Sequence, residues 1–502
     1  MSTHGMPHSW PAARQASTLS ALMAFSLLVL MGMTWPLWTP QTVFPQVPLL
    51  GLALGWPTSI GWVALTGMLT SAASLLALSQ WQRWPPQATV RQGASLLLFS
   101  CFGLLVLIDQ HRLQPWAYQL VAGLLLLSCL PAPSGLRWCR GLVLSIYAWS
   151  ALSKFDLTFL ESTGQRLLSG LLRASGNPFG VWPPSVRLAV VASFPLAELA
   201  LAWGLARRKT RPLALPLSVA MHLTLLLALG PWGLDQHRAV LGWNVYFILQ
   251  NLVLFGPMPK RRDFGRLNFG RWEPEGDLEL AEPNRTPAGQ PQADRTPGRQ
   301  TRIARLVTGA ALFMLLAPAL EPFGYYDHWP AWGLYSVSHD RIILFVSGRA
   351  KGHLPRSVRP FLEAPQAGKP WCRLRTDRWS LATLKAPLYP QARFQLGVAE
   401  AVGGQLRQAG GGPAQYPLRQ PPAIRVVLEG RPNRYTGKRQ MRAVEGLAKI
   451  RALASRYWLN AHPHPDVSNF EMERRHGPQH GKWSNSAGIQ SFFDRTFFQP
   501  NS

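Results

Sequence analysis

The sequence is poor in charged residues and in cysteine for a chain of this length. Of its 502 residues only 15% are charged, whereas soluble proteins average about 25%. None of its four cysteines belongs to a C-x-x-C pair or to a zinc-ligand spacing. We therefore expect no disulfide framework, and we interpret three of the four as small buried thiols in or beside apolar segments. The four are Cys101, Cys129, Cys139 and Cys372.

Acidic residues and recognisable active-site motifs are scarce as well. The chain has 51 Lys and Arg against 24 Asp and Glu, which gives a formal charge of +27. These cations are scattered, and no nucleic-acid-binding module is apparent in the sequence. We predict no nucleic-acid partner and interpret the basic excess as a signal of membrane topology and of attraction to anionic lipid. The sequence also lacks a nucleophile elbow, a phosphate loop and an H-E-x-x-H motif.

What the sequence does contain is a series of long apolar runs. A membrane-spanning helix needs about 20 largely apolar residues. The run Leu19–Met33, with Arg14 before it and no small-residue cleavage site after it, is interpreted as an uncleaved signal anchor. The third to fifth runs are short, so we predict about eight or nine transmembrane helices. The candidate spans are residues 19–38, 57–79, 93–109, 116–131, 138–154, 186–206, 212–230, 238–256 and 303–320.

Composition and charge then predict the domain organisation. The predicted fold class is mainly α: a polytopic transmembrane helical bundle followed by a C-terminal soluble α+β domain. Basic groups such as Arg207-Arg208-Lys209 and Lys260-Arg261-Arg262 fall on one side of a nine-helix arrangement. The positive-inside rule makes this side cytoplasmic, so we expect a cytoplasmic N-terminus and an extracytoplasmic C-terminal domain in the cell (inner) membrane. The predicted parts are a transmembrane domain at 1–256, a polar disordered linker at 257–302, a further transmembrane helix at 303–320 and the soluble domain at 321–502.

Within the soluble domain the patterns are shorter. Arg341–Val346 and Ile424–Leu428 are typical of strands, and Phe394–Ala401 fits either a strand or a short helix. Apolar residues three or four positions apart across Gln440–Tyr457 predict an amphipathic helix. Residues 410–412 and 463–485 are rich in loop-forming residues.

Three ionisable residues lie in or at the ends of predicted spans, where a charge is costly and marks a functional candidate. Glu198 and His222 lie near the middle of spans six and seven, which a short loop makes antiparallel neighbours. Counted from that loop, their depths differ by only about 3 Å, so a Glu198–His222 contact is expected. Such a pair can relay protons, bind a quinone head group or hold a metal. The alternative is a structural hydrogen bond between helices.

The remaining candidates are weaker. Lys154 ends span five near the outer interface, where it can snorkel to lipid head groups or pair with Asp156. In the loop before the C-terminus, His462 and His464 alternate in an extended segment and so can share a metal. No third ligand is evident there, and the alternative is a solvated loop. The sequence assigns no catalytic residue.

Spans five to eight resemble the DoxX/MauE family of small helical membrane proteins associated with thiol or quinone redox processes. The resemblance covers about residues 140–255. It implies a redox-associated helper, with a quinone as a possible cofactor and Lys154, Glu198 and His222 as its site positions. The missing cysteine pair puts direct disulfide chemistry in doubt. The residues that carry the resemblance are Ile146-Tyr147, Ser150-Ala151-Leu152-Ser153-Lys154, Phe159, Gly164, Glu198, Gly204-Leu205 and His222.

A second resemblance is to the HTTM family, which is related to the vitamin K-dependent carboxylases. That family follows its helices with a partly β extracytoplasmic domain, and here Trp329–Tyr335 follows the last span in a similar place. This resemblance implies a carboxylase-like membrane enzyme. We carry no catalytic role over from it, and Lys154 is the only intramembrane lysine candidate that the sequence offers for such an enzyme. The redox-associated helper is the first hypothesis. A non-enzymatic scaffold whose outer domain binds a protein partner is the second, and the carboxylase-like enzyme is the third.

Overall fold

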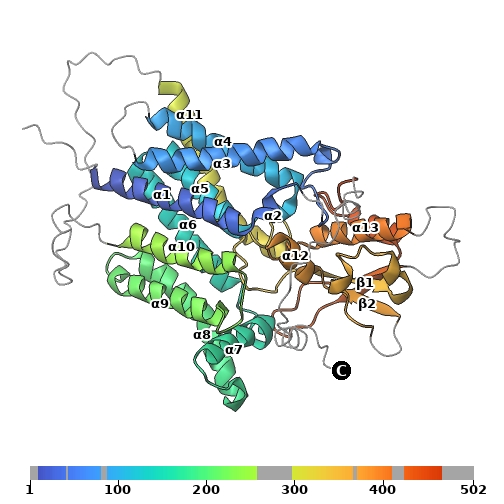
Figure 1. Ribbon diagram of the computed structural model, residues 1–502. Helices are drawn as coiled ribbons and strands as arrows, with labels where there is room; N and C mark the ends of the chain where they lie inside the picture. The colour runs from blue at the N-terminus through green and yellow to red at the C-terminus, as the bar shows by residue number, and fades with distance from the viewer. Residues whose placement is uncertain are drawn as a thin grey trace, which may run out of the picture.

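The protein is described from a computed structural model, in which a helical bundle carries a smaller α+β domain at one end (Figure 1). The structure describes residues 10–40, 43–80, 87–256, 297–365, 370–409 and 423–465. The predicted loop at 410–412, most of the predicted linker and the predicted loop beyond residue 465 lie outside these ranges.

Each of the nine predicted spans falls on a helix. Seven helices in the described part of the chain are long and apolar enough to cross a membrane, so the protein is a multi-pass membrane protein. Two of the nine, α5 and α6, are not among the seven; α5 is a shorter apolar helix. The nine helices are α1 (Trp10–Met33), α3 (Thr58–Gln80), α4 (Gln87–Ile108), α5 (Pro115–Cys129), α6 (Ala132–Leu152), α8 (Pro184–Ala206), α9 (Arg211–Leu229), α10 (Arg238–Phe255) and α11 (Pro297–Leu316).

Helix α5 shows why a short segment can still belong to the bundle. It packs against α1, α4, α6 and α11, and nearly all of its residues are buried. A helix that is apolar on every side fits such a central position, since no face of it meets water. Two further short helices lie at the end of the bundle that meets the C-terminal domain: α2 (Trp35–Trp38) and α7 (Gly164–Ala174).

The C-terminal domain is built on a four-stranded antiparallel sheet with the strand order β2-β1-β3-β4. Side chains of β1 alternate, with Ile342, Leu344 and Val346 buried and their neighbours more exposed. The register pairs Leu344 with Val426 of β3, so both central strands turn apolar side chains toward the packed helix α13. The elements are β1 (Arg341–Ser347), β2 (Trp371–Leu374), β3 (Ile424–Glu429), β4 (Met441–Glu445), α12 (Thr376–Leu384), α13 (Ala392–Ala409) and α14 (Leu447–Ala454).

The structure confirms the two predicted strands, decides the open alternative at Phe394–Ala401 in favour of a helix, and corrects two other expectations. The predicted helix over Gln440–Tyr457 is wrong in its first part: Met441–Glu445 is strand β4, and only Leu447–Ala454 is helical. Gly446, at a φ of +86°, separates strand β4 from the helix. A positive φ fits neither a strand nor a right-handed helix, so one continuous helix cannot include this residue. Phe394–Ala401 lies within helix α13, and helix α11 begins at Pro297, inside the predicted linker.

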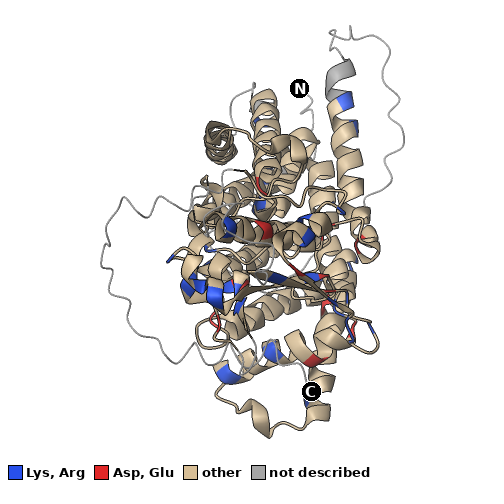
Figure 2. Ribbon diagram, turned by 90° about the vertical axis from the view of Figure 1, so that its right-hand side faces the viewer, with Lys and Arg blue, Asp and Glu red and all other residues tan. Residues whose placement is uncertain are grey.

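The C-terminal domain is packed against the bundle, and the two share one hydrophobic core. The backbone N–H of Asn460 donates to the carbonyl of Leu49 at 3.1 Å, and that of His464 donates to the carbonyl of Gln46 at 2.9 Å. His462 and His464 lie in a loop and are partly exposed, and these hydrogen bonds hold the segment on the loop between α2 and α3. Seen from the C-terminal domain, basic residues around the sheet outnumber acidic ones (Figure 2).

Candidate functional site

Lys154 lies two residues beyond the end of α6 and points back into the bundle. Its Nζ donates to both carboxylate oxygens of Glu198 at 2.7 Å and to Ser150 Oγ at 2.6 Å. Its side chain is only 2% exposed. The expected snorkelling of this lysine is therefore wrong, and so is its pairing with Asp156, which instead accepts a hydrogen bond from the backbone N–H of Phe159.

Glu198 comes from α8, in the turn after Pro195. Its carboxylate faces Lys154 of α6 and is 15% exposed. The expected direct contact between Glu198 and His222 is not present, because α6 packs closely on α8 and supplies a cation nearer than the imidazole. A buried lysine and carboxylate at this distance form a charge-assisted pair that compensates part of the cost of removing both charges from water.

His222, on α9, belongs to a hydrogen-bonded network of its own. Its Nδ1 lies 3.0 Å from Oδ1 of Asn244, whose amide nitrogen is fixed by a hydrogen bond to the carbonyl of Val240. Nδ1 is therefore the donor, and Nε2 accepts from the hydroxyl of Tyr147 at 2.7 Å. That hydroxyl in turn accepts from Asn251 at 2.6 Å. The network joins α6, α9 and α10, which matches the structural alternative for His222.

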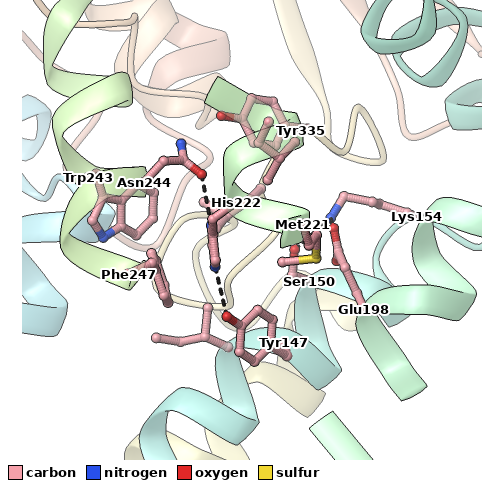
Figure 3. Close-up of a pocket in the computed structure, with 13 residues that line it drawn as sticks. Tyr147, Ser150, Lys154, Glu198, Met221, His222, Trp243, Asn244, Phe247 and Tyr335 are labelled. Atoms are coloured by element: carbon pink, nitrogen blue, oxygen red, sulfur yellow. Dashed lines mark hydrogen bonds and ion pairs between the residues drawn. The ribbon is translucent and has the colours of Figure 1, made fainter. Parts of the chain in front are cut away.

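The ion pair and this network line one small pocket (Figure 3). Its cavity volume is about 40 Å³, enough for roughly three water molecules. Lys154 and Glu198 lie at one end of the pocket, and His222 stacks on Phe247 at the other, with ring centroids 4.9 Å apart. The pocket thus gathers all three residues that the sequence singled out, although only two of them contact each other. Its apolar walls include Ile146, Met221, Leu225 and Leu334.

Sequence reasoning missed Ser150, Asn244 and Tyr335 as lining residues. Ser150 lies one helical turn before Lys154, so its spacing is a signal that could have found it. Tyr335 comes from the C-terminal segment, far along the chain, and nothing in its local sequence indicates the pocket. Burial raises the pKa of the Tyr335 phenol above its ordinary value; a hydrogen bond with Asn244 lowers it by less, and the nearby Glu198 charge adds a smaller increase. This phenol is therefore a protonated donor at neutral pH.

The described residues offer little to a metal or a quinone. No group of three or more His, Cys, Asp or Glu side chains is placed to hold a metal ion in the described ranges. His462 Nδ1 pairs with Glu400 at 2.8 Å instead. Both ring nitrogens of His222 are already engaged, so this imidazole has no free hydrogen-bonding atom for a quinone. All four cysteines are buried and free, and none lines the pocket.

Comparisons with protein families, with curated proteins and with solved structures find no match to this chain.

Proposed function

We propose that the protein is a membrane-embedded acid–base enzyme in which Lys154 and Glu198 exchange a proton with a molecule bound in the pocket. The observation that carries the proposal is the Lys154–Glu198 pair itself, with the ammonium 2% exposed inside a cavity. A buried ion pair is weak support for stability, and ionisable residues within membrane helices mark functional sites. Transfer of one proton from Nζ to the carboxylate leaves a neutral amine and a carboxylic acid, and the amine is then a base.

The carboxylase-like resemblance becomes the first candidate for the reaction class. The segment Trp329–Tyr335 after the last span carries that resemblance, and Lys154 is the one intramembrane lysine candidate for its base. In the structure these parts meet, because Leu334 and Tyr335 line the pocket of Lys154. Such a reaction begins with removal of a proton from a weakly acidic position of the substrate, which is a task for a neutral amine in a water-poor site.

A redox-associated helper of the DoxX/MauE type is the second candidate. The observation that favours it is that Lys154, Glu198 and His222, the positions implied by that resemblance, all line one pocket. It takes second place because no cysteine lines the site and both ring nitrogens of His222 are already engaged. The scaffold hypothesis, with a protein partner bound by the C-terminal domain, stays third.

Labelling with dicyclohexylcarbodiimide, which adds to protonated carboxyl groups, tests the proton exchange. We expect Glu198 to be labelled in the whole protein, faster as the pH falls, and to lose the label in Glu198→Gln. Glu161→Gln is the matched control, since Glu161 is exposed and outside the pocket. Absence of Glu198 labelling between pH 5 and pH 9 would contradict the proposal, because the pair would then be permanently ionised.

Two activity measurements separate the candidates. The carboxylase-like hypothesis predicts that carbon dioxide is incorporated into a substrate peptide, and that Lys154→Ala abolishes this incorporation. The redox reading expects an altered redox state of envelope thiols in both Glu198→Gln and His222→Ala. Loss of a co-purifying partner only on deletion of residues 331–502 supports the scaffold instead.

The proposed orientation places the pocket toward the extracytoplasmic side. Arg140, Arg208 and Arg211 lie near one another, at the end of the bundle away from the C-terminal domain, as the positive-inside rule requires of a cytoplasmic face. Reporter fusions at Gly270 and at Ser502 should therefore report opposite compartments, with Gly270 cytoplasmic. If both fusions report the same compartment, α11 does not cross the membrane and the orientation is wrong.

A further inference from the structure

The residues Trp332–Ser336, here called the strap, run from the last apolar helix toward strand β1 in a strained conformation. Trp332 and Tyr335 both have positive φ values, +61° and +60°. Residues other than glycine adopt such values only where the surroundings enforce them, and such positions concentrate at functional sites. The strap thus holds its two large aromatic residues in place at the expense of local backbone energy.

Packing on both sides holds the strap in this conformation. Trp332 is fully buried and lies against Tyr118 of α5, with ring centroids 5.3 Å apart. Gly333 lies directly over the His328 ring, where an added Cβ would clash with the ring carbon Cε1. His328 Nε2 lies 3.3 Å from the carbonyl oxygen of Ser336, and its Nδ1 lies 3.2 Å from a carboxylate oxygen of Glu321.

The strap reaches the turn that carries Lys154. The hydroxyl of Ser336 donates to the carbonyl of Ser153 at 2.7 Å, one residue before the pocket lysine. Leu334 and Tyr335 form part of the pocket wall, and the Tyr335 ring lies above His222 and Asn244 in the close-up (Figure 3). The C-terminal domain therefore supplies part of a pocket whose other walls are membrane helices.

We propose that the strap closes the pocket from the side of the C-terminal domain, with the Tyr335 ring as the seal. Lys154 and Glu198 are then shielded from water only while the C-terminal domain is docked. The benefit of closure rests on the proposed function, since exclusion of water strengthens charge interactions within the site. The closure itself is a separate property of the fold and can be tested separately.

Accessibility of a thiol placed in the pocket tests the closure. Ser150→Cys puts a sulfur beside Lys154, and a water-soluble methanethiosulfonate reports whether water reaches it; the parent protein gives the background of its four buried cysteines. In the full chain we expect slow labelling of Ser150→Cys and about tenfold faster labelling when Tyr335→Ala is added, since access limits such reactions. Tyr335→Phe keeps the ring and should stay slow. Tyr325→Ala, 71% exposed and upstream in the same segment, is the matched control.

A second variant tests the strap without removing the Tyr335 ring, in case Tyr335→Ala misfolds. Gly333→Ala keeps the ring but forces the strap away from His328, and it should also speed the labelling. Equal rates in the Ser150→Cys protein and in both strap variants would overturn the proposal, as would fast labelling of Ser150→Cys with the strap intact. Absence of carbodiimide labelling at Glu198 would contradict the proton exchange. Fast thiol labelling with the strap intact, or equal rates with and without the strap variants, would contradict the closure.

Discussion

Replacing Lys154 with methionine should destabilise the folded protein by roughly 3–5 kcal/mol, the usual result of breaking a buried ion pair on one side. Methionine has nearly the length of lysine and fills the same space, so the lost packing is small. The cost arises because Glu198, 15% exposed, keeps a carboxylate that has lost its cation. The measurement is thermal unfolding of the purified protein in detergent micelles at neutral pH.

The double variant Lys154→Met, Glu198→Gln separates this effect from loss of shape. It removes both charges, so most of the lost stability should return. The site could then no longer exchange a proton, because neither side chain is ionisable. Lys209→Met, in the exposed loop between α8 and α9, is the matched control and should change little, since surface cations contribute little. If the single and double variants are equally unstable, the pair does not interact as the structure indicates.

The helices and three of the pocket residues were predictable from the sequence, whereas the contacts between the helices were not. The apolar runs fix the helices because lipid leaves a spanning segment few other conformations. The same reasoning found Lys154, Glu198 and His222, because a charge or imidazole in such a run stands out. The similar depth of Glu198 and His222 on neighbouring helices did not predict which side chains they contact. Which helix faces which is decided by packing between α6 and α8, and no pattern within either helix carries that information.

The C-terminal domain shows a different limit. Strands β1 and β3 were predictable from alternating apolar residues, whereas the apolar spacing of Gln440–Tyr457 suits both a helix and a strand followed by a helix. The pairing of β4 with β3 decides between them, and that pairing is a tertiary property. Tyr335 could not be predicted as a pocket residue for the same reason, since its role depends on how the domain docks.

The junction between the bundle and the C-terminal domain should show two opposing pH dependences of stability. Burial raises the pKa of Asp109 to about 6 and lowers that of His111 to about 4. The His111 Nε2 lies 2.8 Å from the carbonyl of Pro387, and Nδ1 has no hydrogen-bond partner among the described residues. A second ring proton would thus find no acceptor there, which agrees with the low pKa. Both residues follow α4, outside its membrane-spanning part.

The signs of the two contributions follow from proton binding. Between pH 4 and pH 6 the folded state holds more protons at Asp109 than the unfolded state does, so this contribution to stability falls as the pH rises. At His111 the folded state holds fewer protons, so its contribution rises over nearly the same window. Each amounts to roughly 3 kcal/mol, and in the parent protein they largely cancel.

Removing one group should expose the dependence of the other. In His111→Gln the free energy of unfolding should fall by roughly 3 kcal/mol from pH 4 to pH 6 relative to the parent, and in Asp109→Asn it should rise by a similar amount. His353→Gln, at an exposed histidine, is the matched control and should follow the parent. Urea unfolding in detergent micelles across this pH range measures the slopes. Parallel curves for all four proteins would mean that neither group is shielded from water at the junction, and so that the domain does not dock on the bundle as described.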